Sequence, residues 1–120
     1  MARVLIVDDA MFMRTTLTTM LSNGNHEVVG QAENGQQAVQ LYKELLPDIV
    51  TMDVTMPVMD GIESVREIVK FDKNAKIIMC SAMGQQKVVV EAIEAGAKDF
   101  IVKPFEELRV LETVNRTLSQ

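Results

Sequence analysis

The sequence has little cysteine, few aromatic residues and no long apolar run. Cys80 is the only cysteine among 120 residues, so no disulfide forms within the chain and an apolar core must stabilise it. Its apolar neighbours predict a buried thiol. No apolar stretch approaches the roughly 20 residues of a membrane span, and a strand pattern begins directly after Met1, so we expect no signal peptide. These absences favour a cytoplasmic protein.

Positive charge is also scarce. The sequence has 12 lysine and arginine residues against 17 aspartate and glutamate residues, which gives a net charge of -5. Such a chain repels nucleic acids and anionic membranes, so we expect neither as a partner. The composition, 48% hydrophobic and 24% charged, is that of an ordinary globular protein. The length suits one domain that spans residues 1–120.

Five short runs rich in valine and isoleucine have the length of β-strands, at residues 4–7, 26–30, 48–52, 76–80 and 99–102. Three of them are continuously apolar, which is typical of strands that are covered on both faces of a parallel sheet. The segments between and after the runs carry apolar residues three or four positions apart, as amphipathic helices do. We therefore predict an α/β fold: a doubly wound, five-stranded parallel sheet with five helices.

Several residues mark where these helices begin and end. Asp60, with Glu63 three positions later, predicts a capped helix start. Gly24 and Gly96 lie where helices should end, and Pro47 prevents the preceding helix from continuing.

Polar residues with reactive side chains follow four of the five predicted strands. The first ends at Asp8-Asp9, the third at Asp53, the fourth at Ser81 and the fifth at Lys103, whereas the second ends at Gly30. In a doubly wound sheet, ligands bind beyond the carboxyl ends of the strands. The sequence therefore predicts three carboxylates, one hydroxyl and one ammonium group at the same edge of the sheet.

Three close carboxylates repel one another and need a cation at neutral pH. Oxygen ligands with room for water favour Mg²⁺. Because neighbouring residues of a strand face opposite sides, Asp8 and Asp9 both contribute only if the chain bends there. A metal beside a free carboxylate suits phosphoryl transfer, with Asp53 as the nucleophile and with Lys103 and Ser81 contacting the phosphoryl oxygens.

Four stretches carry a resemblance to a known family: VLIVDDAMFMR (4–14), DIVTMDVTMPVMDG (48–61), IIMCSAM (77–83) and GAKDFIVKPF (96–105). Together they resemble the response-regulator receiver domains of bacterial two-component signalling, and the similarity spans essentially the whole chain. The family has the flavodoxin-like strand order 2-1-3-4-5. Among its members, the chain is most similar to the stand-alone receivers of chemotaxis.

The resemblance implies a role for each residue of the set. Asp53 would accept a phosphoryl group from a histidine kinase. Asp9 and Asp53 would bind Mg²⁺ through their side chains, Thr55 through its carbonyl oxygen, and Asp8 through water. Lys103 would pair with the phosphoryl group. The family usually has a cis peptide bond at Lys103-Pro104.

The resemblance also implies a two-state switch. Ser81 would move toward the phosphoryl group, Gly84 would give its loop freedom, and the ring of Phe100 would follow inward. Such a domain catalyses only its own phosphorylation and dephosphorylation and is not otherwise an enzyme. Its expected partners are a sensor histidine kinase, the flagellar motor switch protein and a phosphatase, and we expect a monomer.

Two flanking features refine the prediction. Thr55 and Met83 lie two positions after Asp53 and Ser81 and offer little help in orienting an attacking water, so we predict a comparatively stable acyl phosphate. Val88, Val89 and Val90 sweep about 200° of a helix, which is wider than a core stripe. At least one of them should therefore be exposed, on a target-binding face with Phe100 and the last helix.

Three alternatives compete with this interpretation. An aspartyl-phosphate phosphatase would need Asp-x-Asp after its first strand, where this chain has Asp8-Asp9-Ala10. An FMN-binding module would need a phosphate loop, and the two acids would repel phosphate there. A phosphorelay intermediate would keep the same site but would pass its phosphoryl group to another histidine.

Overall fold

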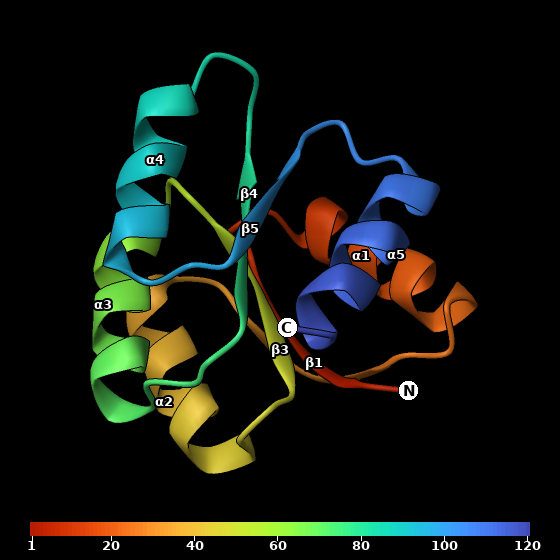
Figure 1. Cartoon of the computed structure of the whole chain (residues 1–120), viewed down its shortest axis with the longest axis horizontal. Helices are drawn as coiled ribbons and strands as arrows, with labels where there is room; N and C mark the ends of the chain where they lie inside the picture. Colours follow the sequence, from red (N-terminus) through yellow and green to blue (C-terminus); the bar gives the residue numbers. More distant parts are fainter.

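Strands and helices alternate along the whole chain (Figure 1). This computed structural model describes residues 1–120. The strands are β1 (Arg3–Val7), β2 (Glu27–Ala32), β3 (Ile49–Asp53), β4 (Ile77–Ser81) and β5 (Asp99–Val102). The helices are α1 (Met11–Asn23), α2 (Gly35–Leu45), α3 (Gly61–Phe71), α4 (Gln86–Ala95) and α5 (Glu107–Leu118).

All neighbouring strands of the single sheet are parallel, and their order is β2-β1-β3-β4-β5. The predicted doubly wound fold and its strand order are thus confirmed. The register pairs Val7 of β1 with Met52 of β3, and Ser81 of β4 with Val102 of β5. The carboxyl ends of the central strands therefore lie side by side.

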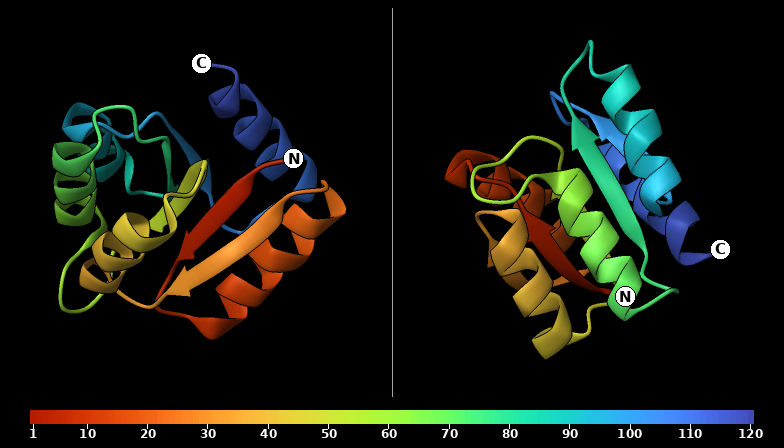
Figure 2. Two further views of the ribbon diagram at one scale, coloured as in Figure 1. Left: turned by 90° about the horizontal axis from the view of Figure 1, so that it is seen from below. Right: turned by 90° about the vertical axis from the view of Figure 1, so that its left-hand side faces the viewer.

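Helices cover both faces of the sheet. α1 and α5 lie on one face, and α2, α3 and α4 lie on the other (Figures 1 and 2). In β1, Val4 and Ile6 pack in the core with α1 and α5, whereas Leu5 and Val7 pack in the core on the opposite face. A strand buried on both sides needs apolar residues at every position, which explains its continuous apolar run.

The residues predicted to begin or end helices lie at helix ends in the structure. Oδ1 of Asp60 accepts a hydrogen bond from the Glu63 N–H at 2.9 Å and so caps the start of α3. Gly24 ends α1 and Gly96 ends α4, the latter with a φ of 127° that favours glycine. None of the five helices combines the length and the apolar content needed to cross a bilayer.

The second strand ends later than the sequence predicts, whereas the cysteine is buried as predicted. The prediction that the second strand ends at Gly30 is wrong by two residues, because β2 continues to Ala32, which pairs with Val7. Gln31 interrupts the apolar pattern, but its backbone still pairs with β1 and its side chain accepts a hydrogen bond from Arg14. Cys80 is buried as predicted, and burial raises the pKa of its thiol to about 12.

The start of α3 packs directly against the end of β3. A Cβ atom on Gly61 would collide with the carbonyl oxygen of Asp53, and the Gly61 N–H donates to the Val54 carbonyl at 2.9 Å. Only glycine permits this close approach of the backbones. Gly61 thus fixes the position of the strand end that carries Asp53.

Replacing Gly61 with alanine should therefore destabilise the fold. The added methyl group must displace backbone rather than a flexible side chain, so we expect Gly61→Ala to lower the free energy of unfolding by about 1–3 kcal/mol. Urea unfolding followed by circular dichroism measures the difference. Glu63→Gln, an exposed position in the same turn at which glutamine can still serve in a capping box, is the control; equal unfolding midpoints for the two variants would contradict the close-approach argument.

Candidate functional site

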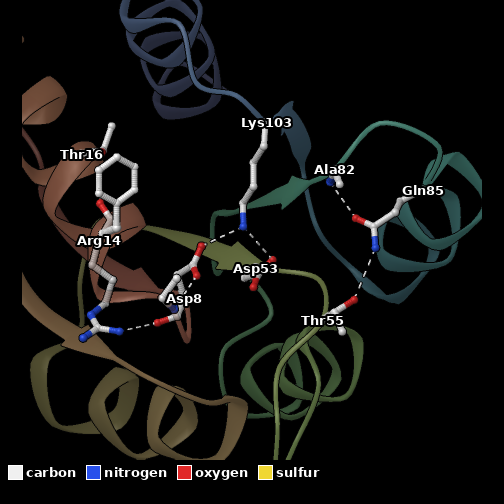
Figure 3. Close-up of polar contacts among 10 residues, drawn as sticks. Asp8, Arg14, Thr16, Asp53, Thr55, Ala82, Gln85 and Lys103 are labelled. Atoms are coloured by element: carbon white, nitrogen blue, oxygen red, sulfur yellow. Dashed lines mark hydrogen bonds and ion pairs between the residues drawn. The ribbon is translucent and has the colours of Figure 1, made fainter.

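Side chains from three strand ends meet at the carboxyl edge of the sheet. Asp8 directly follows β1, Asp53 is the last residue of β3, and Lys103 directly follows β5. Asp8 and Asp53 are 2% and 7% exposed. Their ionisable groups come together in space, as shown in Figure 3, although they are as much as 95 residues apart in the sequence.

The chain bends at Asp9, directly after β1. As a result, carboxylate oxygens of Asp8, Asp9 and Asp53 lie within 4.8 Å of one another, with Asp9 the exposed member. Oδ1 of Asp8 accepts a hydrogen bond from the Ala10 N–H at 2.9 Å, which helps to fix the bend. The predicted departure from regular strand geometry is confirmed, and it allows both adjacent acids to face the same site.

Lys103 supplies the cation of this cluster. Its Nζ lies 3.0 Å from Oδ2 of Asp8 and 3.3 Å from Oδ1 of Asp53. The peptide bond between Lys103 and Pro104 is cis, as the family resemblance implied. Lys103 N–H also donates to the Ser81 carbonyl at 2.7 Å, which joins the ends of β4 and β5 beside the acids.

The electrostatics of the site leave negative charge uncompensated. Burial and then the charge of Asp8 raise the pKa of Asp53 to about 6, although Lys103 opposes the shift. Burial lowers the pKa of Lys103, but its hydrogen bond to Asp8 and the charges of Asp53 and Asp8 raise that pKa overall. Lys103 therefore stays protonated at neutral pH, and one ammonium group faces three carboxylates.

This donor set fits a hard divalent cation. All three acidic residues offer oxygen atoms, no histidine or cysteine side chain joins the group, and the exposed Asp9 leaves one side open to solvent. Mg²⁺ prefers such oxygen ligands and keeps part of its water shell. Burial and the charge of Asp8 raise the pKa of Asp53, and Lys103 offsets only part of that shift, so a bound cation would stabilise the ionised cluster.

The structure places the remaining predicted residues around this cluster. Ser81 is buried at the end of β4, and Thr55 is exposed on the loop after β3. Phe100, in β5, is 45% exposed. A cavity of about 430 Å³ between α4 and β5 is lined by Ser81, Val89 and Phe100, among others. Val90 is 57% exposed, which confirms that one of the three consecutive valines lies off the core.

Arg14, on α1, is a site residue that the sequence reasoning missed. It is only 6% exposed; its Nη1 donates to the Asp8 carbonyl at 2.7 Å and its Nε to Oε1 of Gln31 at 3.0 Å. The guanidinium group therefore binds the backbone carbonyl at the start of the Asp8–Asp9 bend. The signal was its spacing, because Arg14 lies three residues before Leu17 and seven before Leu21, on the core-facing side of the helix.

Gln85 is a second residue that was missed. Its side chain lies between the loop after β4 and the loop after β3, where it contacts Ala82 and Thr55 (Figure 3). Nothing in the local sequence distinguishes this glutamine from Gln86, which follows it.

Comparison with known proteins agrees with the geometry. Residues 4–115 match the response regulator receiver domain family. A chemotaxis protein CheY from Thermotoga maritima is 63% identical over 114 residues, which cover 95% of both chains. A chemotaxis protein CheY from Bacillus subtilis is 62% identical over 117 residues, which cover 98% of both chains.

A solved structure shows the same similarity in three dimensions. It is the CheX-CheY-BeF3-Mg+2 complex from Borrelia burgdorferi, in which one chain matches with a TM-score of 0.93 and 42% identity over 98% of this chain and 90% of that chain. The acidic cluster with its lysine thus lies at the carboxyl edge of a sheet whose fold and sequence are those of receivers. The chain belongs to the response regulator receiver domain family and is a receiver of the chemotaxis type.

Proposed function

We propose that this chain is a single-domain response regulator that phosphorylation of Asp53 activates. The observation that carries the proposal is the position of Asp53: a nearly buried carboxylate in contact with a lysine ammonium group and next to two further acids. Membership of the receiver family favours this role over the free-standing phosphatase alternative. The names of the two relatives favour chemotaxis over a phosphorelay.

The chemical step needs a nucleophile and a leaving group. Asp53 is the nucleophile, and with a pKa of about 6 its side chain is roughly nine-tenths ionised at pH 7. One of its oxygens attacks the phosphorus atom of a phosphohistidine on a sensor kinase. A P–O bond forms, the P–N bond breaks, and the electron pair goes to the imidazole nitrogen, which takes a proton from water.

The surrounding residues bind and orient the incoming group. Lys103 already contacts Asp53 at 3.3 Å, so its ammonium group is placed to pair with a phosphoryl oxygen on that carboxylate. Asp8, Asp9, Asp53 and the carbonyl oxygen of Thr55 would hold Mg²⁺. When bound, this ion supplies the positive charge that the cluster lacks and offsets the charge of the phosphoryl oxygens.

The switch uses the residues around the cavity next to the site. The Ser81 hydroxyl moves to donate to a phosphoryl oxygen. The half-exposed ring of Phe100 then turns into the cavity of about 430 Å³ that it borders with Ser81 and Val89. Gly84, with a φ of 90° and open space around it, gives the connecting loop its freedom.

The target-binding surface is the face formed by α4, β5 and α5. Val90, Phe100, Val102 and Leu108 are all exposed there, at 40–80%. Apolar side chains in such number on one face suit a protein partner. We propose the flagellar motor switch protein as that partner, a sensor histidine kinase as the phosphoryl donor, a phosphatase as a further partner, and a cytoplasmic monomer as the working form.

Phosphorylation at Asp53 should be visible in the intact mass. Incubation with acetyl phosphate and Mg²⁺ should add one phosphoryl group to the wild-type chain, and Asp53→Asn should add none, because the amide is not a nucleophile. Asp9→Asn keeps the acceptor but loses one metal ligand, so it should reach the same product only at a higher Mg²⁺ concentration. A phosphoryl group gained by Asp53→Asn, or gained by the wild-type chain with EDTA present, would contradict this assignment.

The raised pKa of Asp53 predicts a pH-dependent stability. The contribution of this group to stability is fully present below its ordinary pKa of 3.8 and is lost as the pH rises through about 6. With EDTA present, Asp53→Asn should therefore be more stable than the wild type at pH 7.5, by about 1–2 kcal/mol after allowance for solvent screening.

Urea unfolding at several pH values measures this difference. It should shrink toward zero between pH 6 and pH 4, as the wild-type carboxyl group becomes protonated. Glu94→Gln removes an exposed charge elsewhere and serves as the control. A stability difference that does not change with pH would show that the charge of Asp53 is not its origin.

The residues that flank the site predict a long-lived acyl phosphate. Thr55 and Met83 are both exposed beside the site, and neither is an amide or an acid that could orient an attacking water. Thr55→Asn supplies such an amide and should shorten the lifetime several-fold. Loss of the phosphoryl mass over time after removal of acetyl phosphate measures both rates. A wild-type lifetime of only seconds, or a longer lifetime in Thr55→Asn, would be the contrary result.

A further inference from the structure

The side chain of Gln85 joins the two loops that flank the phosphorylation site. Its Oε1 accepts a hydrogen bond from the Ala82 N–H at 2.7 Å, and its Nε2 donates to the Thr55 hydroxyl at 3.4 Å (Figure 3). Ala82 follows Ser81 at the end of β4, and Thr55 lies two residues after Asp53. We call these two hydrogen bonds the Gln85 bridge. The bridge lies beside Asp53, on the side of the site where α4 begins (Figure 3).

Gln85 forms this bridge instead of capping its own helix. It occupies the N-cap position of α4, with φ -102° and ψ 28°, yet its side chain makes no capping hydrogen bond. The amide oxygen that could accept from the first turn of α4 is used by the Ala82 N–H. The bridge thus ties the start of α4, one helix of the target-binding face, to the ends of β3 and β4.

The bridge belongs to the arrangement that the structure shows. Because Ser81 and Ala82 are adjacent, a movement that carries the Ser81 hydroxyl toward a phosphoryl group on Asp53 would also shift the Ala82 N–H relative to the Gln85 side chain, which Thr55 holds at its other end. Such a shift would break the hydrogen bond of 2.7 Å from the Ala82 N–H to Gln85. An interaction made in only one of two states stabilises that state and shifts the equilibrium toward it.

We propose that Gln85 is a positioning residue that holds the loop after β4 in its unphosphorylated position, through the bridge to Ala82 and Thr55. This inference rests on the proposed function. It adds to that function a specific restraint, made by a side chain that would not itself touch the phosphoryl group and that sets how readily the domain enters its activated state.

Loss of the bridge should make activation easier. One net hydrogen bond corresponds to about a fivefold change in an equilibrium constant. Removing Gln85 weakens the unphosphorylated arrangement by about that factor, so ligands that select the activated arrangement should bind correspondingly tighter. Ligands that bind both arrangements equally should show no change.

The test is the affinity for beryllofluoride, a mimic of the phosphoryl group on a carboxylate, in the presence of saturating Mg²⁺. NMR titration of the whole chain gives the dissociation constant for the wild type, Gln85→Ala and Gln86→Ala. We expect Gln85→Ala to bind about fivefold tighter than the wild type. Gln86→Ala should match the wild type, because this neighbouring glutamine is exposed and lies in the same turn without a side-chain hydrogen bond.

A second readout needs neither metal nor mimic. Hydrogen exchange of the Ala82 amide should be faster in Gln85→Ala than in the wild type and unchanged in Gln86→Ala, because only the first substitution removes its acceptor. Gln85→Met keeps the length of the side chain and its apolar stem. It should behave as Gln85→Ala does, which keeps the test decisive if the alanine variant folds poorly.

The outcomes separate this inference from the proposed function. A wild-type chain that binds beryllofluoride, with equal or weaker binding by Gln85→Ala and Gln85→Met, supports the receiver function and overturns the role of the bridge. Unchanged exchange at Ala82 in both variants overturns it as well. A wild-type chain that does not bind the mimic contradicts the proposed function and this inference together.

Discussion

One ammonium group is shared by carboxylates that the fold brings together, and the chemistry of the site depends on that contact. Lys103 lies within 3.3 Å of both Asp8 and Asp53, and Asp9 adds a third carboxylate. Lysine alone cannot neutralise three acids, so burial and repulsion keep the pKa of Asp53 high. The remaining negative charge favours the binding of a divalent cation.

The strand order makes this contact possible. β1 and β3 are neighbours at the centre of the sheet, so Asp8 and Asp53 leave it side by side. Lys103 comes from the edge strand β5, with β4 between it and β3. Strands lie about 4.8 Å apart, so the lysine must extend past the end of β4. Ser81 ends that strand, and its carbonyl oxygen accepts a hydrogen bond of 2.7 Å from the Lys103 N–H, which fixes the backbone from which the lysine extends.

Much of this arrangement could be predicted from the sequence, because it depends on patterns that a sequence displays. Continuous apolar runs gave the strands, and the rule that ligands bind at the carboxyl ends of strands grouped Asp53, Ser81 and Lys103. The end of β2 was missed because Gln31 is polar yet pairs through its backbone. The spacing of Arg14 placed it on the core-facing side of α1 but did not reveal that Gln31 and the Asp8 carbonyl are its partners. Gln85 was missed because its contact with Thr55 joins positions 30 residues apart, which no local pattern reveals.

Arg14 and Gln85 also explain how the site can be well ordered although its clustered negative charges destabilise the folded state. Uncompensated negative charge destabilises the folded state, and functional sites often contain such locally destabilising groups. Arg14 stabilises the backbone at the acids, because its Nη1 donates to the buried Asp8 carbonyl at 2.7 Å. Gln85 contacts the loops after β3 and β4 on the other side of Asp53, and the proposed switch requires the second of these loops to move. If Asp53 accepts a phosphoryl group as we propose, the Arg14 contact would hold the backbone at Asp8 before and after phosphorylation, whereas the Gln85 bridge would favour only the unphosphorylated state. This difference would let one phosphoryl group change the face formed by α4, β5 and α5 while the acids stay in place.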